Sequence, residues 1–148
     1  MGRRRKAREF CLQILFQLEF CADSPSKVLE EFWSEKRVLP EIKEYTEWLV
    51  KGIIDQKEVI DDLIQSVSQN WELERMSLVD RNILRLAVFE LLEEAHLQPA
   101  IIINEAIEIA KKYSTEKASI FVNGLLDAVR RKLDLEKMEA QPKSKQEK

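Results

Sequence analysis

Five cations close to the start of the chain carry the clearest chemistry in this sequence. Residues 3 to 8 contain Arg3, Arg4, Arg5, Lys6 and Arg8 and no acidic side chain. Such concentrated positive charge repels itself and is neutralised best by a polyanion, so phosphate is the leading candidate for its partner. Arginine suits RNA, because its planar guanidinium binds phosphate with two hydrogen bonds and stacks on bases. We therefore expect residues 1–8 to form a basic RNA-binding arm.

The alternative is that this arm is only the solvated tip of a helix. Cations at a helix N-terminus oppose the macrodipole and cost about 0.3–1 kcal/mol each, so stability alone does not explain their presence. We expect the arm to bury almost no apolar surface. The rest of the chain is acidic: the sequence has 24 basic and 27 acidic residues, and without the arm it has 19 and 27, a net charge of -8.

Catalytic and cofactor chemistry have few residues available. One histidine, His96, and two cysteines, Cys11 and Cys21, cannot assemble a zinc site or a histidine-based triad. The three glycines are not clustered, which excludes a P-loop and a dinucleotide fingerprint. We therefore expect no enzyme, no metal and no cofactor. Cysteines ten residues apart on one helix lie about 15 Å apart, too far for a disulfide, and reduced cysteines suit a cytoplasmic protein.

Three further polar residues are candidates for a site: Asn104, Glu105 and Asn123. Asparagine does not titrate, and one glutamate without a nucleophile or a metal is no acid–base pair. We expect their side chains to cap helices or to cross-link the fold through hydrogen bonds. No membrane partner is expected, because the longest apolar run covers only residues 100–103.

Helical periodicity runs almost from end to end, and no segment alternates like a strand, so the sequence predicts an all-α fold of about seven helices. These cover about residues 5–20, 25–33, 40–53, 56–67, 78–94, 100–113 and 118–133, with expected N-terminal caps at Ser24, at Asp55 with Glu58, and at Ser77 with Asp80. The fifth helix is apolar around more than half its circumference, which predicts a central position. Residues 136–148 are polar and predict a flexible tail.

A break near Trp71 divides the expected helical domain, residues 9–135, into subdomains of about 9–70 and 71–135 that share the fifth helix. Trp33, Trp48 and Trp71 are expected in the core or at a partner contact, and the sequence does not separate these options.

Four blocks of sequence carry a resemblance to a known family. They are RRRKARE at 3–9 followed by Gln13, VDRNILRLAVFEL at 79–91, INEAIEIAK at 103–111 and FVNGLLD at 121–127. In this order, over about residues 3–130, they resemble the NusB family of transcription antitermination factors. The resemblance implies two small three-helix bundles that share a central long helix. It also implies that the protein binds the boxA-type RNA of nascent transcripts and forms a pair with NusE, a small-subunit ribosomal protein. Through the RNA and NusE, the protein would be linked indirectly to the RNA polymerase antitermination complex.

Four residues extend the expected RNA-binding set beyond the arm. Phe16 lies behind the arm on a face of the first helix and is expected either exposed or buried against another helix. Phe121 begins the FVNG block that lies near RNA in the family, although helical spacing alone favours a core position. Lys117, four residues earlier, would share its face and add a phosphate contact. Asp80 matches an acidic family position near the base-reading surface, and capping the fifth helix is the alternative.

The leading hypothesis is thus a non-enzymatic, RNA-binding antitermination factor. A second hypothesis is a helical adaptor that binds only proteins, its arm meeting an acidic partner. A third is a module related to the N-terminal domain of certain RNA cytosine methyltransferases. The methyltransferase reaction itself would need a Rossmann-like region with a glycine-rich turn, and these 148 residues contain neither.

Overall fold

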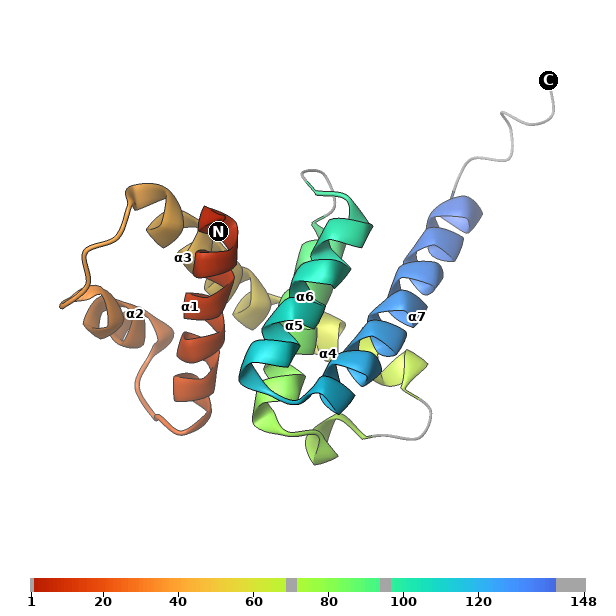
Figure 1. Ribbon diagram of the computed structural model, residues 1–148, viewed down its shortest axis with the longest axis horizontal. Helices are drawn as coiled ribbons and strands as arrows, with labels where there is room; N and C mark the ends of the chain where they lie inside the picture. Colours follow the sequence, from red (N-terminus) through yellow and green to blue (C-terminus); the bar gives the residue numbers. More distant parts are fainter. Residues whose placement is uncertain (1, 69–71, 94–96, 141–148) are drawn as a thin grey trace, which may run out of the picture.

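The computed structural model describes residues 2–68, 72–93 and 97–140, and in this part of the chain the fold is all-α (Figure 1). The helices are α1 (Arg3–Glu19), α2 (Pro25–Trp33), α3 (Pro40–Asp55), α4 (Lys57–Val67), α5 (Leu78–Leu92), α6 (Pro99–Tyr113) and α7 (Glu116–Ala140), with a short 3-10 helix, η1 (Leu73–Arg75), before α5. The predicted fold class is confirmed. None of the described helices is long and apolar enough to cross a membrane.

Two of the expected caps are present. The Ser24 hydroxyl accepts from the Lys27 N–H at 3.2 Å, and the Ser77 hydroxyl accepts from the Asp80 N–H at 3.1 Å. The expected cap at Asp55 is wrong, because α3 continues through that residue and α4 follows after Gln56 alone. The Gln56 carbonyl already accepts the first bond of α4, so Asp55 has no separate helix start to cap.

Helix α5 is the centre of the molecule, as its sequence predicted. Every residue from Asn82 to Leu91 is buried, and α5 packs against α1, α3, α4, α6 and α7. Gly52 lets α3 approach α5 closely, because a Cβ atom there would lie 2.1 Å from Cζ of the buried Phe89. The two halves of the fold therefore meet along this helix.

Helix α4 connects the two sides of the fold. Helices α1 to α3 lie on one side and α5 to α7 on the other (Figure 1). Helix α4, whose buried residues are Ile60 and Ile64, packs mainly against α5 and α7 and less against α3. Trp71 and His96 lie outside the described residues.

Helix α7 extends beyond its expected end near Leu133. Residues 134–140 are exposed, yet they continue the helix because leucine, glutamate, lysine, methionine and alanine favour helix and no breaker occurs before Pro142. Part of the predicted flexible tail is thus helical. The remainder, residues 141–148, lies outside the described residues.

Candidate nucleic-acid interface

The predicted arm forms the first two turns of α1, which begins at Arg3 rather than at Arg5. Helical geometry sends its five cations in different directions, because successive residues are about 100° apart around the axis. Arg3, Arg4 and Lys6 are exposed, Arg5 is half-buried and Arg8 is buried. We call this group the α1 cationic end.

Arg8 sits inside the protein, with 3% of its surface exposed. Its Nε donates to Oε1 of Glu90 at 2.7 Å, and its Nη2 donates to Oε2 at 2.9 Å. The Tyr45 hydroxyl also donates to Glu90, and Nη1 of Arg8 lies 3.4 Å from Oε1 of Glu105. The sequence predicts Arg8 among the RNA-binding residues, whereas the structure encloses its guanidinium and directs its hydrogen bonds to internal carboxylates.

The surroundings of Arg8 and Tyr45 shift the pKa values of both side chains. Burial disfavours the guanidinium of Arg8, but the hydrogen bond and charge of Glu90 outweigh burial, so the pKa of Arg8 lies above its ordinary value. Burial and the negative charge of Glu90 raise the pKa of Tyr45, so its hydroxyl stays protonated and donates. The expectation that the arm buries almost no apolar surface is wrong, since Ala7 is fully enclosed.

Arg5 joins α1 to α6. Its Nε donates to Oε1 of Glu105 at 2.8 Å, and its Nη2 donates to the second carboxylate oxygen. The hydrogen bond from Arg5 holds the pKa of Glu105 below its ordinary value. Glu105 therefore cross-links the fold, the role its sequence position suggested, whereas Asn104 and Asn123 are exposed.

The other three cations remain at the surface. Nη1 of Arg3 donates to both carboxylate oxygens of Glu41, at 2.8 and 2.7 Å, in a largely exposed pair. The Arg4 guanidinium lies 5.1 Å from the centre of the Tyr45 ring. Lys6 lies 4.8 Å from the centre of a phenylalanine ring one turn further along α1. Among the described residues neither Arg4 nor Lys6 forms an ion pair, so both are available to an anion.

Helices α1 and α6 run parallel, because Arg5 pairs with Glu105 and, further along both helices, Glu9 pairs with Lys112. Figure 1 shows the two helices descending together to their C-terminal ends. Nζ of Lys112 donates to Oε2 of Glu9 at 3.1 Å, and this bond raises the pKa of the lysine. Phe16 follows Glu9 by two turns on the same face of α1, about 10 Å further along the helix axis.

The structure settles how the predicted aromatic and acidic residues are exposed. Phe16 is 41% exposed and packs edge-to-face against Phe20, with ring centres 5.2 Å apart. Phe121 is half-buried against the core, one turn after the exposed Lys117. Asp80 lies in the first turn of α5, where Ser77 is the cap. Its buried Oδ1 has no hydrogen-bond partner within the described part of the chain.

Sequence reasoning did not place any residue of α3 or α5 beside the α1 cationic end. Tyr45 and Trp48 are one turn apart on α3, with ring centres 5.3 Å apart, and Trp48 is 37% exposed. Glu90 comes from α5. The spacing of Tyr45 and Trp48 placed them on one helical face, but only the packing of α3 against α1 brings that face beside the arginines.

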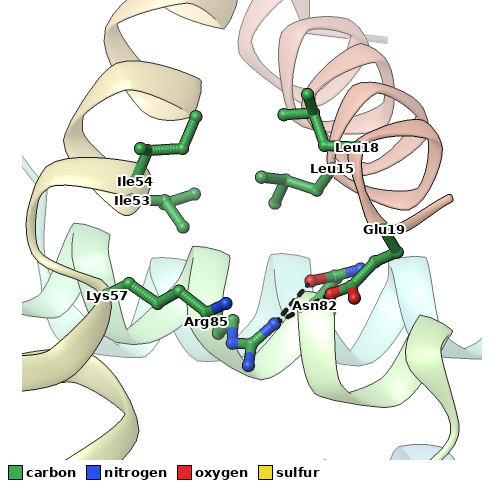
Figure 2. Close-up of a pocket in the computed structure, with 8 residues that line it drawn as sticks. All are labelled: Leu15, Leu18, Glu19, Ile53, Ile54, Lys57, Asn82 and Arg85. Carbon is green, nitrogen blue, oxygen red and sulfur yellow. Dashed lines mark hydrogen bonds and ion pairs between the residues drawn. The ribbon is translucent and has the colours of Figure 1, made fainter. Parts of the chain in front are cut away.

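A second buried arginine borders a cavity of about 120 Å³ where α1, α3, α4 and α5 meet. Nε and Nη2 of Arg85 donate to Asp61 at 2.8 and 3.0 Å, and Nη1 donates to Glu19 at 3.2 Å. Figure 2 shows this guanidinium beside Glu19 and Asn82, with leucine and isoleucine side chains on the other side of the cavity. Two carboxylates neutralise one guanidinium here and no aromatic ring lines the cavity, so it does not suit an RNA strand.

The fold and its surface define an all-helical binding protein whose exposed cations, with aromatic rings nearby, suit a polyanion. Within the described residues no cluster of side chains could hold a metal ion. The model of the NusB family matches residues 5–131, and the chain belongs to this family.

Relatives of known class align with this chain over nearly their whole lengths. The transcription antitermination protein NusB of Bdellovibrio bacteriovorus is 49% identical over 128 residues, covering 85% of this chain and 93% of the relative. The NusB protein of Leptospira biflexa is 39% identical over 132 residues, covering 89% and 94%. These relatives confirm the expected class, a transcription antitermination factor rather than an enzyme.

Solved structures give the same result. NusB of T. maritima superposes with a TM-score of 0.79 at 40% identity, covering 100% of this chain and 99% of that one. A chain from a crystal structure of antitermination factors NusB and NusE in complex with dsRNA superposes with a TM-score of 0.79 at 30% identity, covering 88% and 98%.

Proposed function

We propose that this transcription antitermination factor binds boxA-type single-stranded RNA together with NusE, and that it joins the RNA polymerase antitermination complex in the cytoplasm through this pair. The observation that carries the proposal is the α1 cationic end, where Arg3, Arg4 and Lys6 remain exposed although a cation at a helix N-terminus is unfavourable. A ligand that carries phosphate explains why positive side chains lie where they oppose the dipole of their own helix.

The RNA surface runs from the α1 cationic end toward the C-terminal end of the same helix. Arg3 and Phe16 are thirteen residues apart, which is about 20 Å along the helix axis. Phe16 supplies an exposed ring for stacking at the far end, and Lys117 with the half-buried Phe121 continues the surface onto α7. Asp80, which is half-buried in the first turn of α5, completes the proposed RNA-binding set.

NusE belongs in the proposal because the exposed contacts of this chain are few. Three exposed cations and one or two rings offer too little surface for tight sequence-specific binding, so a joint surface with a second protein supplies the rest. The crystal structure of antitermination factors NusB and NusE in complex with dsRNA, which contains a similar chain, supports a pair with NusE that binds RNA.

Titration of labelled single-stranded RNA with and without purified NusE tests the proposal. We expect higher affinity in the presence of NusE and, at equal length, tighter binding of single-stranded than of double-stranded RNA. Equal affinity with and without NusE contradicts the joint surface. Absence of RNA binding in both conditions, with NusE still bound, favours the protein-only adaptor.

A further inference from the structure

A cavity of about 320 Å³ lies between the α1 cationic end and α3. It is lined by Arg3, Arg4, Glu41, Glu44, Tyr45 and Trp48. Its size falls in the range of about 300–1,000 Å³ that is typical of sites for small molecules. The four residues from α3 follow helical spacing, so they form one continuous face directed at the start of α1.

The aromatic wall of this cavity is held in place from behind. Trp48 packs against the buried Phe89 with ring centres 4.9 Å apart, and Tyr45 donates its hydroxyl hydrogen to the buried Glu90. Trp48 is nevertheless more than a third exposed. An exposed ring with a fixed orientation is a stacking surface for an unstacked base, and such stacking is common in the recognition of single-stranded RNA.

The charged walls supply both kinds of hydrogen-bonding group. Arg3 and Arg4 present guanidinium donors, which suit phosphate. Of the two carboxylates, Glu41 is already paired with Arg3, whereas Glu44 forms no ion pair with any residue that the structure describes. Glu44 is therefore the free acceptor of the cavity.

A carboxylate distinguishes the bases by their hydrogen-bond donors. Guanine presents two adjacent donors on its Watson–Crick edge, the ring N1–H and the N2 amino group, which match the two oxygens of one carboxylate. Adenine and cytosine present an amino group beside a ring nitrogen that repels a carboxylate. The ring N–H of uracil lies between two carbonyl oxygens, which repel a carboxylate as well. Glu44 thus favours guanine.

We propose that this cavity binds one unstacked guanine base of RNA, with the base against Trp48, its N1–H and N2 amino group donating to Glu44, and neighbouring phosphates on Arg3 and Arg4. The proposal rests on the RNA-binding function proposed above and adds a base-specific subsite to it. It also explains why Trp48 is exposed beside the arginines rather than enclosed in the core.

Three heptaribonucleotides test the subsite: UUUGUUU, UUUUUUU and a version with inosine at the central position, each titrated against the full chain with NusE present. We expect the guanine RNA to bind roughly 5- to 150-fold more tightly than the uracil RNA, the range for one good bidentate contact. Inosine, which lacks the N2 amino group, should fall between them. RNA should also quench tryptophan fluorescence in the wild type and less in Trp48→Phe.

The deciding variant is Glu44→Gln, because Glu44 is exposed and its replacement does not disturb the core. Its amide keeps one acceptor and loses the charge that matches the two donors of guanine, so the ratio of guanine to uracil affinity should fall close to one. Glu58→Gln on α4 is the matched control and should keep the wild-type ratio.

Two results would overturn the subsite and leave the proposed function standing: RNA binding with no preference for guanine, or a preference that survives Glu44→Gln. If none of the RNAs binds, even in the presence of NusE, the proposed function and the subsite both fail.

Discussion

Arg8 and Arg85 are both buried where the two halves meet, yet they belong to surfaces of different kinds. Each guanidinium donates two hydrogen bonds to one carboxylate, Glu90 or Asp61, and touches a second carboxylate. Arg8 lies beneath exposed cations and aromatic rings, whereas Arg85 borders a small cavity with an apolar side (Figure 2). The number of arginines therefore does not locate an RNA surface; what matters is which of them remain exposed to solvent.

The two buried pairs also differ in how completely water is excluded. Glu90 is 1% exposed, whereas the Asp61 and Glu19 side chains are 23% and 25% exposed. A buried charge that loses its partner is costly in proportion to its isolation from solvent. Removal of one carboxylate from each pair measures this difference directly.

The largest expected effect comes from Glu90→Ala. This change leaves Arg8 charged and enclosed and removes the acceptor of the Tyr45 hydroxyl, so the free energy of unfolding should fall by about 3–5 kcal/mol. Urea denaturation followed by circular dichroism measures it. A decrease below about 1 kcal/mol would mean that water replaces the carboxylate and that Arg8 is not tightly enclosed.

Asp61→Ala is the matched change at the second arginine and should cost less, about 1–3 kcal/mol. Glu19 still accepts from Arg85 in this variant, and the site is closer to solvent. The dependence of RNA affinity on salt should remain that of the wild type. A change in that dependence would show that the Arg85 cavity takes part in RNA binding.

Glu105→Gln tests the half-buried link between α1 and α6. Because the folded-state pKa of Glu105 is lowered by Arg5, its stabilisation is complete above the unfolded value of about 4.3 and is lost as pH falls through the lowered folded value. The variant should be less stable than the wild type at neutral pH, by less than about 1 kcal/mol, and equally stable in acid. A stability difference that persists in strong acid would contradict an ionic role.

Replacement of Arg3 and Arg4 by alanine should have the smallest effect on stability, within about 0.5 kcal/mol, because both are exposed. The slope of log affinity for single-stranded RNA against log salt should become shallower by about 0.7 for each phosphate that is no longer neutralised, or about 1.4 for both. Arg131→Ala, which removes an exposed cation on α7, serves as the control. An unchanged slope would transfer phosphate binding to Lys111, Lys112 and Lys117.

Substitution is a better test of the arm than deletion of residues 2–8. Deletion would remove Arg8 and leave Glu90 buried without its cation, so weaker RNA binding could reflect a damaged fold. Separate substitutions of Arg3 and Arg8 distinguish the two roles of this basic segment, which are phosphate binding and stabilisation of the fold.

The sequence by itself determined the helices, the central position of α5 and the family. Apolar residues at helical spacing, the serine caps and the nearly continuous apolar surface of α5 are local features, and they need no knowledge of the fold. The sequence-based helix boundaries were wrong in two places. The junction at Gln56 depends on how neighbouring helices meet, and the extension of α7 depends on helix propensity without burial.

Only the tertiary structure decided which basic residues can reach a ligand. Arg8 shares a helical face with Cys11 and Leu12, but the carboxylate that neutralises it is 82 residues away, and the partner of Arg5 is 100 residues away. The cavity with Trp48 likewise depends on α3 packing against α1. Burial and charge pairing are set by segments distant in sequence, so residue type and spacing predict a basic segment but not which of its charges remain free.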